Sequence, residues 1–91
     1  MTVSVILCVY NEEKFVRKAI ESILNQTLDD VELIIVNDGS TDSTLDVIRS
    51  YDDDRIILIN QENAGLGASR NRGIEIASGE YMTFLDGDDY D

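Results

Sequence analysis

The stretch VELIIVNDGSTD, residues 31–42, decides the fold of this chain. It opens with an almost continuous run of Val, Leu and Ile, which is typical of a strand that is covered on both faces in a parallel sheet. Polar residues follow at once, and Asp38, Gly39 and Ser40 suit a turn before a helix. The stretch therefore predicts a buried strand that carries a carboxylate to the end of a sheet.

Three further apolar runs resemble this one, and helical patterns separate all four. The runs are Val3–Val9, Arg55–Asn60 and Glu80–Asp86. Helices are expected within residues 11–26, 42–51 and 65–77, with Asn11 capping the first and Gly79 closing the third. The order β-α-β-α-β-α-β predicts an α/β protein, a three-layer Rossmann-like fold with a mostly parallel sheet and right-handed crossovers.

The composition excludes several classes of function. The chain has 91 residues, of which 19 are Asp or Glu and 7 are Lys or Arg, so its formal net charge is −12. We expect no nucleic-acid partner, because binding to phosphates needs basic patches. The sequence contains no His, which excludes Ser-His-Asp and Cys-His triads, and a single cysteine, Cys8, excludes a disulfide framework.

The sequence also bears on location. No apolar run approaches the roughly 20 residues that a membrane-spanning helix needs. The first residues predict a buried strand and lack the basic start and cleavage site of a signal peptide. We therefore expect a cytoplasmic protein, with the inner face of the membrane as an alternative for a longer parent protein.

Acidic residues at two expected strand ends suggest chemistry. Asp38 offers a carboxylate, which only accepts hydrogen bonds and so suits a nucleobase edge with N–H groups, such as uracil or guanine. The alternative is that Asp38 merely shapes a turn. Asp86 and Asp88 follow the last strand at D-x-D spacing, and their oxygens suit Mg²⁺ or Mn²⁺. Here the alternative is a solvated acidic loop.

The glycine-rich stretch ENAGLGASRNRG, residues 62–73, does not form a complete dinucleotide motif. The third glycine of GxGxxG is replaced by Arg70, and the stretch follows the third strand rather than the first. Arg70 and Arg72 point in different directions on a helix, so we expect at most one of them to meet an anion.

Taken in order, three segments resemble the start of a family 2 glycosyltransferase with the GT-A fold. They are SVILCVYNEEKFVRKAIESILNQT, ELIIVNDGSTDST and NAGLGASRNRGIEIASGEYMTFLDGDD, and together they cover nearly the whole chain. The resemblance implies a nucleotide-diphospho-sugar partner, with a UDP-sugar favoured, and Mg²⁺ or Mn²⁺ as cofactor. It implies nucleotide-sugar-binding roles for Val9, Tyr10, Glu12, Asp38, Arg70, Asn71 and Asp86. Among these, Asp38 would face the base and Asp86 the ribose or sugar, while Asp88 would be the metal ligand.

Members of this family continue well beyond the D-x-D motif, where they supply the acceptor surface and the general base. The resemblance therefore implies that residues 1–91 are the N-terminal half of a GT-A domain, truncated just after the D-x-D motif. This half would be the part that binds the nucleotide-diphospho-sugar. We expect no catalytic residue in this chain and no activity from it alone. The parent would transfer a sugar to a hydroxyl of a saccharide or lipid-linked acceptor.

A rival hypothesis belongs to a different class of protein. The chain could be a non-catalytic nucleotide-binding or self-associating α/β module. An unpaired edge strand near Glu80–Asp86 would recruit partners, so we expect a homo-oligomer in that case.

Overall fold

The computed structural model describes residues 2–25 and 30–86, in which strands and helices alternate. The elements are β1 (Val3–Val9), α1 (Glu13–Leu24), β2 (Val31–Asp38), α2 (Thr44–Arg49), β3 (Ile56–Gln61), α3 (Leu66–Ile76) and β4 (Tyr81–Asp86). Their order is the one that the apolar runs predict. The α/β fold class is confirmed.

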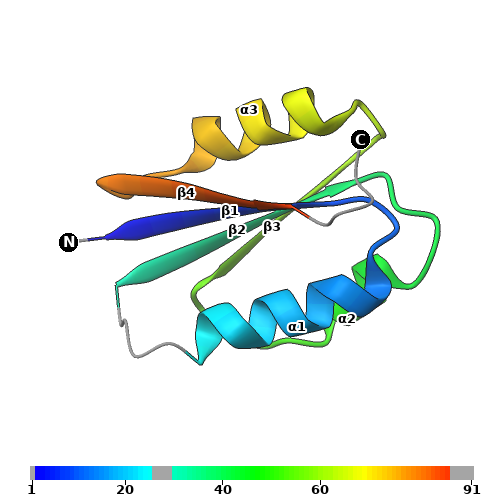
Figure 1. Ribbon diagram of the computed structural model, residues 1–91, viewed down its shortest axis with the longest axis horizontal. Helices are drawn as coiled ribbons and strands as arrows, with labels where there is room; N and C mark the ends of the chain where they lie inside the picture. The colour runs from blue at the N-terminus through cyan, green and yellow to red at the C-terminus, as the bar shows by residue number, and fades with distance from the viewer. Residues whose placement is uncertain (1, 26–29, 87–91) are drawn as a thin grey trace.

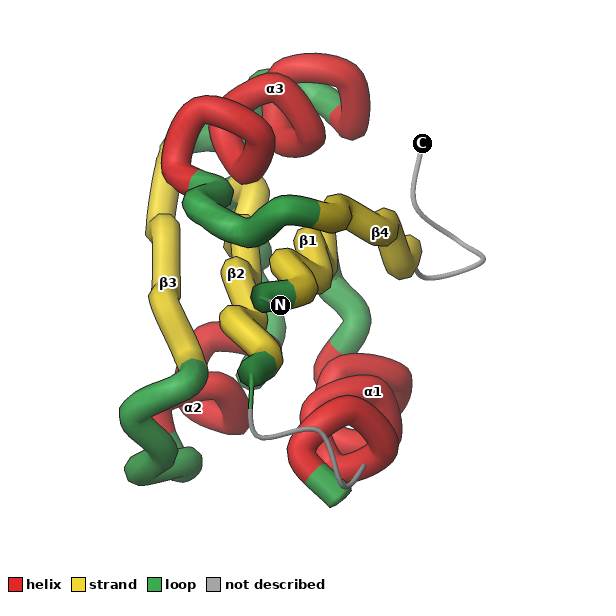
Figure 2. Tube along the Cα trace, turned by 90° about the vertical axis from the view of Figure 1, so that its left-hand side faces the viewer, coloured by secondary structure: helices red, strands yellow, loops and turns green. Residues whose placement is uncertain are grey.

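The four strands form one parallel sheet in the order β3-β2-β1-β4. Helices α1 and α2 cover one face, and α3 covers the other (Figures 1 and 2). The chain moves outward from β1 through β2 to β3 and then returns past both to β4. Because crossovers between parallel strands are right-handed, this change of direction moves α3 to the opposite face. The strand order therefore reverses between β1 and β4.

In the part of the chain that the structure describes, two apolar clusters form the core, one on each face of the sheet. The larger lies under α1 and α2 and contains Val5, Leu7, Val9, Val16, Ala19, Ile20, Ile23, Val31, Leu33, Ile35 and Ile48. The smaller lies under α3 and contains Ile6, Cys8, Ile34 and Val36. Successive residues of a strand point to opposite faces, so the two central strands, β1 and β2, need apolar residues at nearly every position.

Helix α3 meets the sheet through small residues. Its buried residues are Ser69 and Gly73. A Cβ atom at Gly73 would lie 2.4 Å from Cγ2 of Ile6, far inside van der Waals contact. The absence of a side chain at Gly73 therefore lets α3 lie directly on β1.

Two expected helix ends are wrong. Helix α1 begins at Glu13 with Glu12 at the N-cap position, and Asn11 has a left-handed φ of 53°. Helix α3 is followed by Ala77 in an extended conformation, so Gly79 does not close it. Gly79 is needed for close approach instead, because a Cβ there would lie 2.5 Å from Oγ of Ser4. Both residues serve contacts between distant segments, which local helix signals do not reveal.

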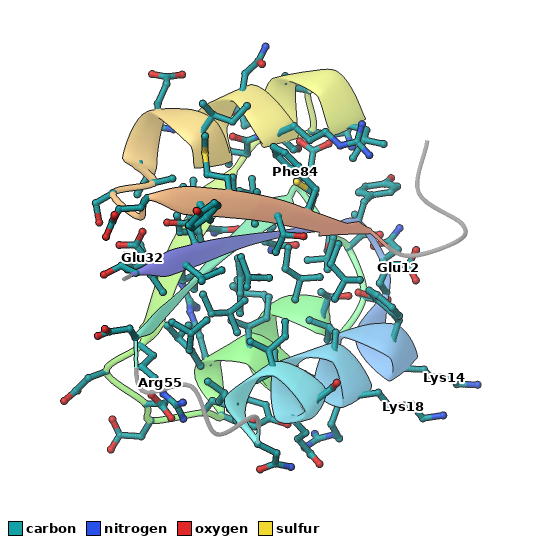
Figure 3. All side chains as sticks on the ribbon, turned by 60° about the vertical axis from the view of Figure 1, so that its left-hand side comes forward. Glu12, Lys14, Lys18, Glu32, Arg55 and Phe84 are labelled. Atoms are coloured by element: carbon teal, nitrogen blue, oxygen red, sulfur yellow. The ribbon has the colours of Figure 1, made fainter. Side chains whose placement is uncertain are left out.

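Glu32 joins three segments at the amino-terminal end of the sheet (Figure 3). Its carboxylate accepts hydrogen bonds from the hydroxyl of Ser4 (2.7 Å) and from the backbone N–H and hydroxyl of Ser78 (both 2.9 Å). The Ser4 hydroxyl in turn accepts one from the N–H of Gly79 (2.9 Å). Glu32 thus ties β1 and β2 to the loop that leads into β4.

The hydrogen bond from the backbone N–H of Ser78, with those from the two hydroxyls, lowers the pKa of Glu32 below its ordinary value of 4.5 and outweighs the opposing effect of burial. The ionised form therefore stabilises the fold above about pH 4.5, and this contribution is lost as the pH falls through the folded-state pKa. We expect Glu32→Gln to lower the melting temperature at pH 7 and to reduce the further drop between pH 6 and pH 3. Thermal unfolding followed by circular dichroism measures both. The matched control is Glu75→Gln, which alters an exposed carboxylate 4.0 Å from Arg72; equal curves for the two variants would contradict the role of Glu32.

Candidate functional site

The candidate site lies beyond the carboxyl ends of the strands, where parallel sheets bind ligands at a reversal of strand order. That reversal lies between β1 and β4, so the site includes the residues that follow Val9 and the end of β4 at Asp86. Asp86 pairs in register with Cys8 of β1. The side chain of Val9 is fully buried in the larger core cluster, so its backbone is the part that can meet a ligand. Tyr10 is half-buried beside the smaller cluster.

Asn11 connects the loops that follow β1 and β2. Its side-chain oxygen accepts hydrogen bonds from the backbone N–H of Thr41 (2.7 Å) and, at 3.3 Å, from that of Asp42. Its own backbone N–H donates to Oγ of Ser40 (2.9 Å). The left-handed conformation needed for these bonds is one that asparagine adopts more readily than most residues. Asn11 thus holds the loop that follows β1 against the loop that follows β2.

A second set of contacts holds the start of α1. The backbone N–H of Glu12 donates to the buried hydroxyl of Thr44 (2.9 Å), and the carboxylate of Asp42 accepts hydrogen bonds from the N–H (2.9 Å) and hydroxyl of Thr44. Burial raises the pKa of Asp42, but hydrogen bonds from Thr44 and from the backbone N–H of Glu13 outweigh it, and the net shift is downward. Glu12 itself is buried, beyond the carboxyl end of β1 (Figure 3). These bonds fix Glu12 between α1 and α2.

Asp38 is fully buried and holds the loop between β3 and α3. Its Oδ1 accepts hydrogen bonds from the backbone N–H of Ala64 (2.8 Å) and from Nε2 of Gln61 (3.0 Å). Its Oδ2 accepts them from the backbone N–H of Gly65 (2.9 Å) and from Nδ2 of Asn63 (3.4 Å). The sequence alternatives, a turn residue or a base contact, did not include this link between distant loops.

The position of Asp38 also suits the electrostatics of α3. Gly65 occupies the N-cap position of this helix with φ 97°, a conformation that favours glycine. A carboxylate that accepts the N–H of Gly65 lies at the positive end of the helix dipole, where negative charge is stabilising. Asp38 therefore anchors the start of α3 to the end of β2.

The two arginines of α3 separate as expected from their spacing. The guanidinium carbon of Arg70 lies 5.9 Å from the centre of the Phe84 ring on β4, within the range of a cation–π contact. Arg72 is exposed, and its guanidinium lies 4.0 Å from the carboxylate of Glu75. Asn71 is also exposed. Arg70 is thus the arginine that reaches toward the β4 side of the site.

The expected metal ligand, Asp88, lies outside the described residues. Within residues 2–25 and 30–86, no group of three or more His, Cys, Asp or Glu side chains is arranged to hold a metal ion. The described helices also include none that is long and apolar enough to cross a membrane. The cytoplasmic location stays a prediction.

Sequence reasoning missed the residues that hold the loops together. They are Asn11 as a loop connector, Asp42, Thr44, Gln61 and Asn63. Asn11, Gln61 and Asn63 stand at or just beyond a strand end, and Asp42 and Thr44 stand at the start of α2. These positions are the signal that could have drawn attention to them.

Comparisons with known proteins agree with this arrangement. Residues 4–91 match the family described as Glycosyl transferase family 2. The putative glycosyltransferase EpsH of Bacillus subtilis is 51% identical over 90 residues, which are 97% of this chain and 26% of that protein.

Two solved structures resemble the chain in three dimensions. TarS 1–349 from S. aureus, in complex with UDP-GlcNAc, superposes with a TM-score of 0.89 at 34% identity, covering 99% of this chain and 27% of TarS 1–349. The mannosyltransferase PcManGT from Pyrobaculum calidifontis, in complex with GDP-Man and Mn²⁺, has a TM-score of 0.85 at 27% identity, covering 92% of this chain and 26% of that one. The chain therefore spans about a quarter of the length of these relatives. By the family match over residues 4–91, this chain belongs to glycosyl transferase family 2.

Proposed function

We propose that this chain is the nucleotide-diphospho-sugar-binding part of a glycosyltransferase. The observation that carries the proposal is that β1, β2 and β4 end side by side. Asp38 and Asp86 are the last residues of β2 and β4, and Tyr10 directly follows β1; these three residues define the rim of the sheet. The rim lies at the reversal of strand order, where this class of sheet binds nucleotides. Support comes from solved relatives that hold UDP-GlcNAc and GDP-Man.

The proposed donor is a nucleotide-diphosphate sugar, with a UDP-sugar favoured. The carboxylate of Asp38 is an acceptor for an N–H group of uracil or guanine. Arg70 offers a planar guanidinium, which suits phosphate oxygens. Glu12, Asn71 and the backbone of Val9 complete the proposed donor site, with Asp86 beside the ribose or sugar.

We also propose a requirement for Mg²⁺ or Mn²⁺. The net charge of −12 opposes the approach of a diphosphate, so the site needs a cation beside it. Carboxylate oxygens of a D-x-D pair are the donors that such hard cations prefer, and Asp88 would be the ligand. A bound cation would neutralise the charge that develops on the departing diphosphate.

The transfer itself would need parts beyond this chain. In the parent, a hydroxyl of a saccharide or lipid-linked acceptor would attack the anomeric carbon while a general base accepts its proton. The bond from that carbon to the diphosphate oxygen would break, and the nucleoside diphosphate would leave with the bonding electrons. We assign no residue of this chain to that step. Residues 1–91 alone are therefore proposed to bind donor without turnover, in the cytoplasm or, in the parent, at the inner face of the membrane.

Calorimetric titration of the 91-residue chain tests donor binding. We expect UDP or GDP to bind at up to millimolar concentration and Mn²⁺ to strengthen the binding. CDP is the matched control, because N3 of cytosine accepts a hydrogen bond where N3 of uracil donates one. If neither UDP nor GDP binds at millimolar concentration, with or without Mn²⁺, the proposed donor site in this chain is wrong.

A second candidate function, a self-associating module, is favoured by the exposure of β4. Within residues 2–25 and 30–86, this strand pairs with β1 alone and forms one edge of the sheet. It exposes apolar side chains on both of its faces. Tyr81, Met82, Phe84 and Leu85 are 37–59% exposed. An unpaired apolar edge recruits another strand, and a second copy of this chain is the proposed occupant.

Light scattering at increasing protein concentration tests self-association. We expect dimers or larger species, and Met82→Lys should shift them toward monomer by placing a charge on the edge strand. A monomer at millimolar concentration would rule out this candidate and leave donor binding unaffected.

A further inference from the structure

The carboxylate of Asp38 is covered and saturated with hydrogen bonds. It is fully buried, and residues 61–65 alone give it four donors. An ionised carboxylate has about four lone-pair positions, so these donors fill it. A base N–H can therefore reach Asp38 only if one of them gives way.

The four hydrogen bonds to Asp38 differ in length and in what they hold together. The backbone N–H groups of Ala64 and Gly65 make the two shortest bonds, 2.8 and 2.9 Å, and they anchor the start of α3. Nε2 of Gln61 bonds at 3.0 Å and also lies 3.3 Å from Oγ of Ser69, within α3. Losing any of these three would loosen the link between β2 and α3.

Asn63 is the donor whose hydrogen bond to Asp38 can break with the smallest loss of stability. Its bond to Oδ2 of Asp38 is the longest of the four, 3.4 Å, and its side chain is exposed. The same Nδ2 donates a shorter bond, 3.0 Å, to the backbone carbonyl oxygen of Asp38. A small rotation can therefore break the first bond and keep the second.

The backbone of Asn63 is held in place while its side chain is exposed. A Cβ at Gly39 would lie 2.6 Å from the backbone nitrogen of Asn63, so the two loops touch directly. The φ of Gly39 is 74°, which also favours glycine. The carboxamide of Asn63 thus pivots on a fixed point beside the carboxylate.

We propose that the Asn63 carboxamide occupies the position on Asp38 that a nucleobase N–H takes when the donor binds. This proposal rests on the proposed function. Asn63 is then a specificity-determining residue: it keeps the buried carboxylate paired in the free protein and yields it to a base whose edge carries an N–H group. An approaching base must compete with this internal amide.

The test compares Asn63→Ala with wild type in titrations with UDP and with N3-methyl-UDP, which lacks the N–H group. We expect the variant to bind UDP about two- to tenfold more tightly, because the competing bond is gone, and to bind the methylated analogue no more tightly than wild type does. Asn60→Ala is the matched control, because the Asn60 side chain bonds Asn37 rather than Asp38. Circular dichroism confirms that each variant is folded.

A second measurement needs no substitution. In wild type, the side-chain amide resonances of Asn63 should shift on saturation with UDP by more than those of Asn60. The inference would be overturned by unchanged or weaker UDP binding in Asn63→Ala, by equal tightening for the two nucleotides, or by Asn63 resonances that do not shift. In each of these cases, UDP binding by wild type would still support the proposed function. If wild type binds GDP but not UDP, the same comparison is made with GDP and N1-methyl-GDP. Wild type that binds neither UDP nor GDP would overturn both the inference and the proposed function.

Discussion

Asp38→Ala is expected to weaken nucleotide binding by about 1–3 kcal/mol, with and without Mn²⁺, because a charged hydrogen-bond acceptor for the base is lost. The same substitution removes the partner of the backbone N–H groups of Ala64 and Gly65. We therefore expect the free energy of unfolding to fall as well, by about 1–3 kcal/mol. Calorimetry with UDP and chemical denaturation measure the two losses.

Two further variants separate the loss of a charge from general damage. Asp38→Asn keeps the size of the side chain but loses one acceptor oxygen, so we expect an intermediate loss in both measurements. Asp52→Ala removes an exposed carboxylate from the loop between α2 and β3 and is expected to change neither. Full nucleotide affinity in Asp38→Ala would show that this rim does not hold the base.

The fold could be predicted because its signals are local and repeated. A central parallel strand must be apolar on both faces, and Val5–Val9 and Leu33–Val36 show this without any knowledge of partners. Alternation with helices then implies a parallel sheet. Even α3, whose buried positions are only Ser69 and Gly73, was expected at nearly its observed bounds. The expected range, 65–77, exceeds α3 by one residue at each end.

The internal arrangement of the rim could not be predicted in the same way. A strand-end carboxylate can meet a ligand or another loop, and the sequence alone does not distinguish these. The structure shows that Asp38 meets residues 61–65, more than twenty positions along the chain. Asn11 was expected at a helix cap because asparagine is common there, whereas it binds Thr41 and Asp42. Such contacts depend on which loops the sheet order makes neighbours.

The charge of the rim gives the metal proposal its sharpest test. Asp88→Asn is expected to abolish the part of UDP binding that depends on Mn²⁺, while the weaker metal-free binding persists. The reason is that an amide is a poorer ligand for a hard cation than a carboxylate, and without the cation the acidic chain repels the diphosphate. Asp88→Asn should also leave the fold intact and raise the metal-free melting temperature slightly, because like charges in the sequence DGDDYD repel one another. Asp89→Asn removes the same charge outside the D-x-D spacing and should keep the response to Mn²⁺. An equal response to Mn²⁺ in wild type and Asp88→Asn would show that residues other than Asp88 hold the cation.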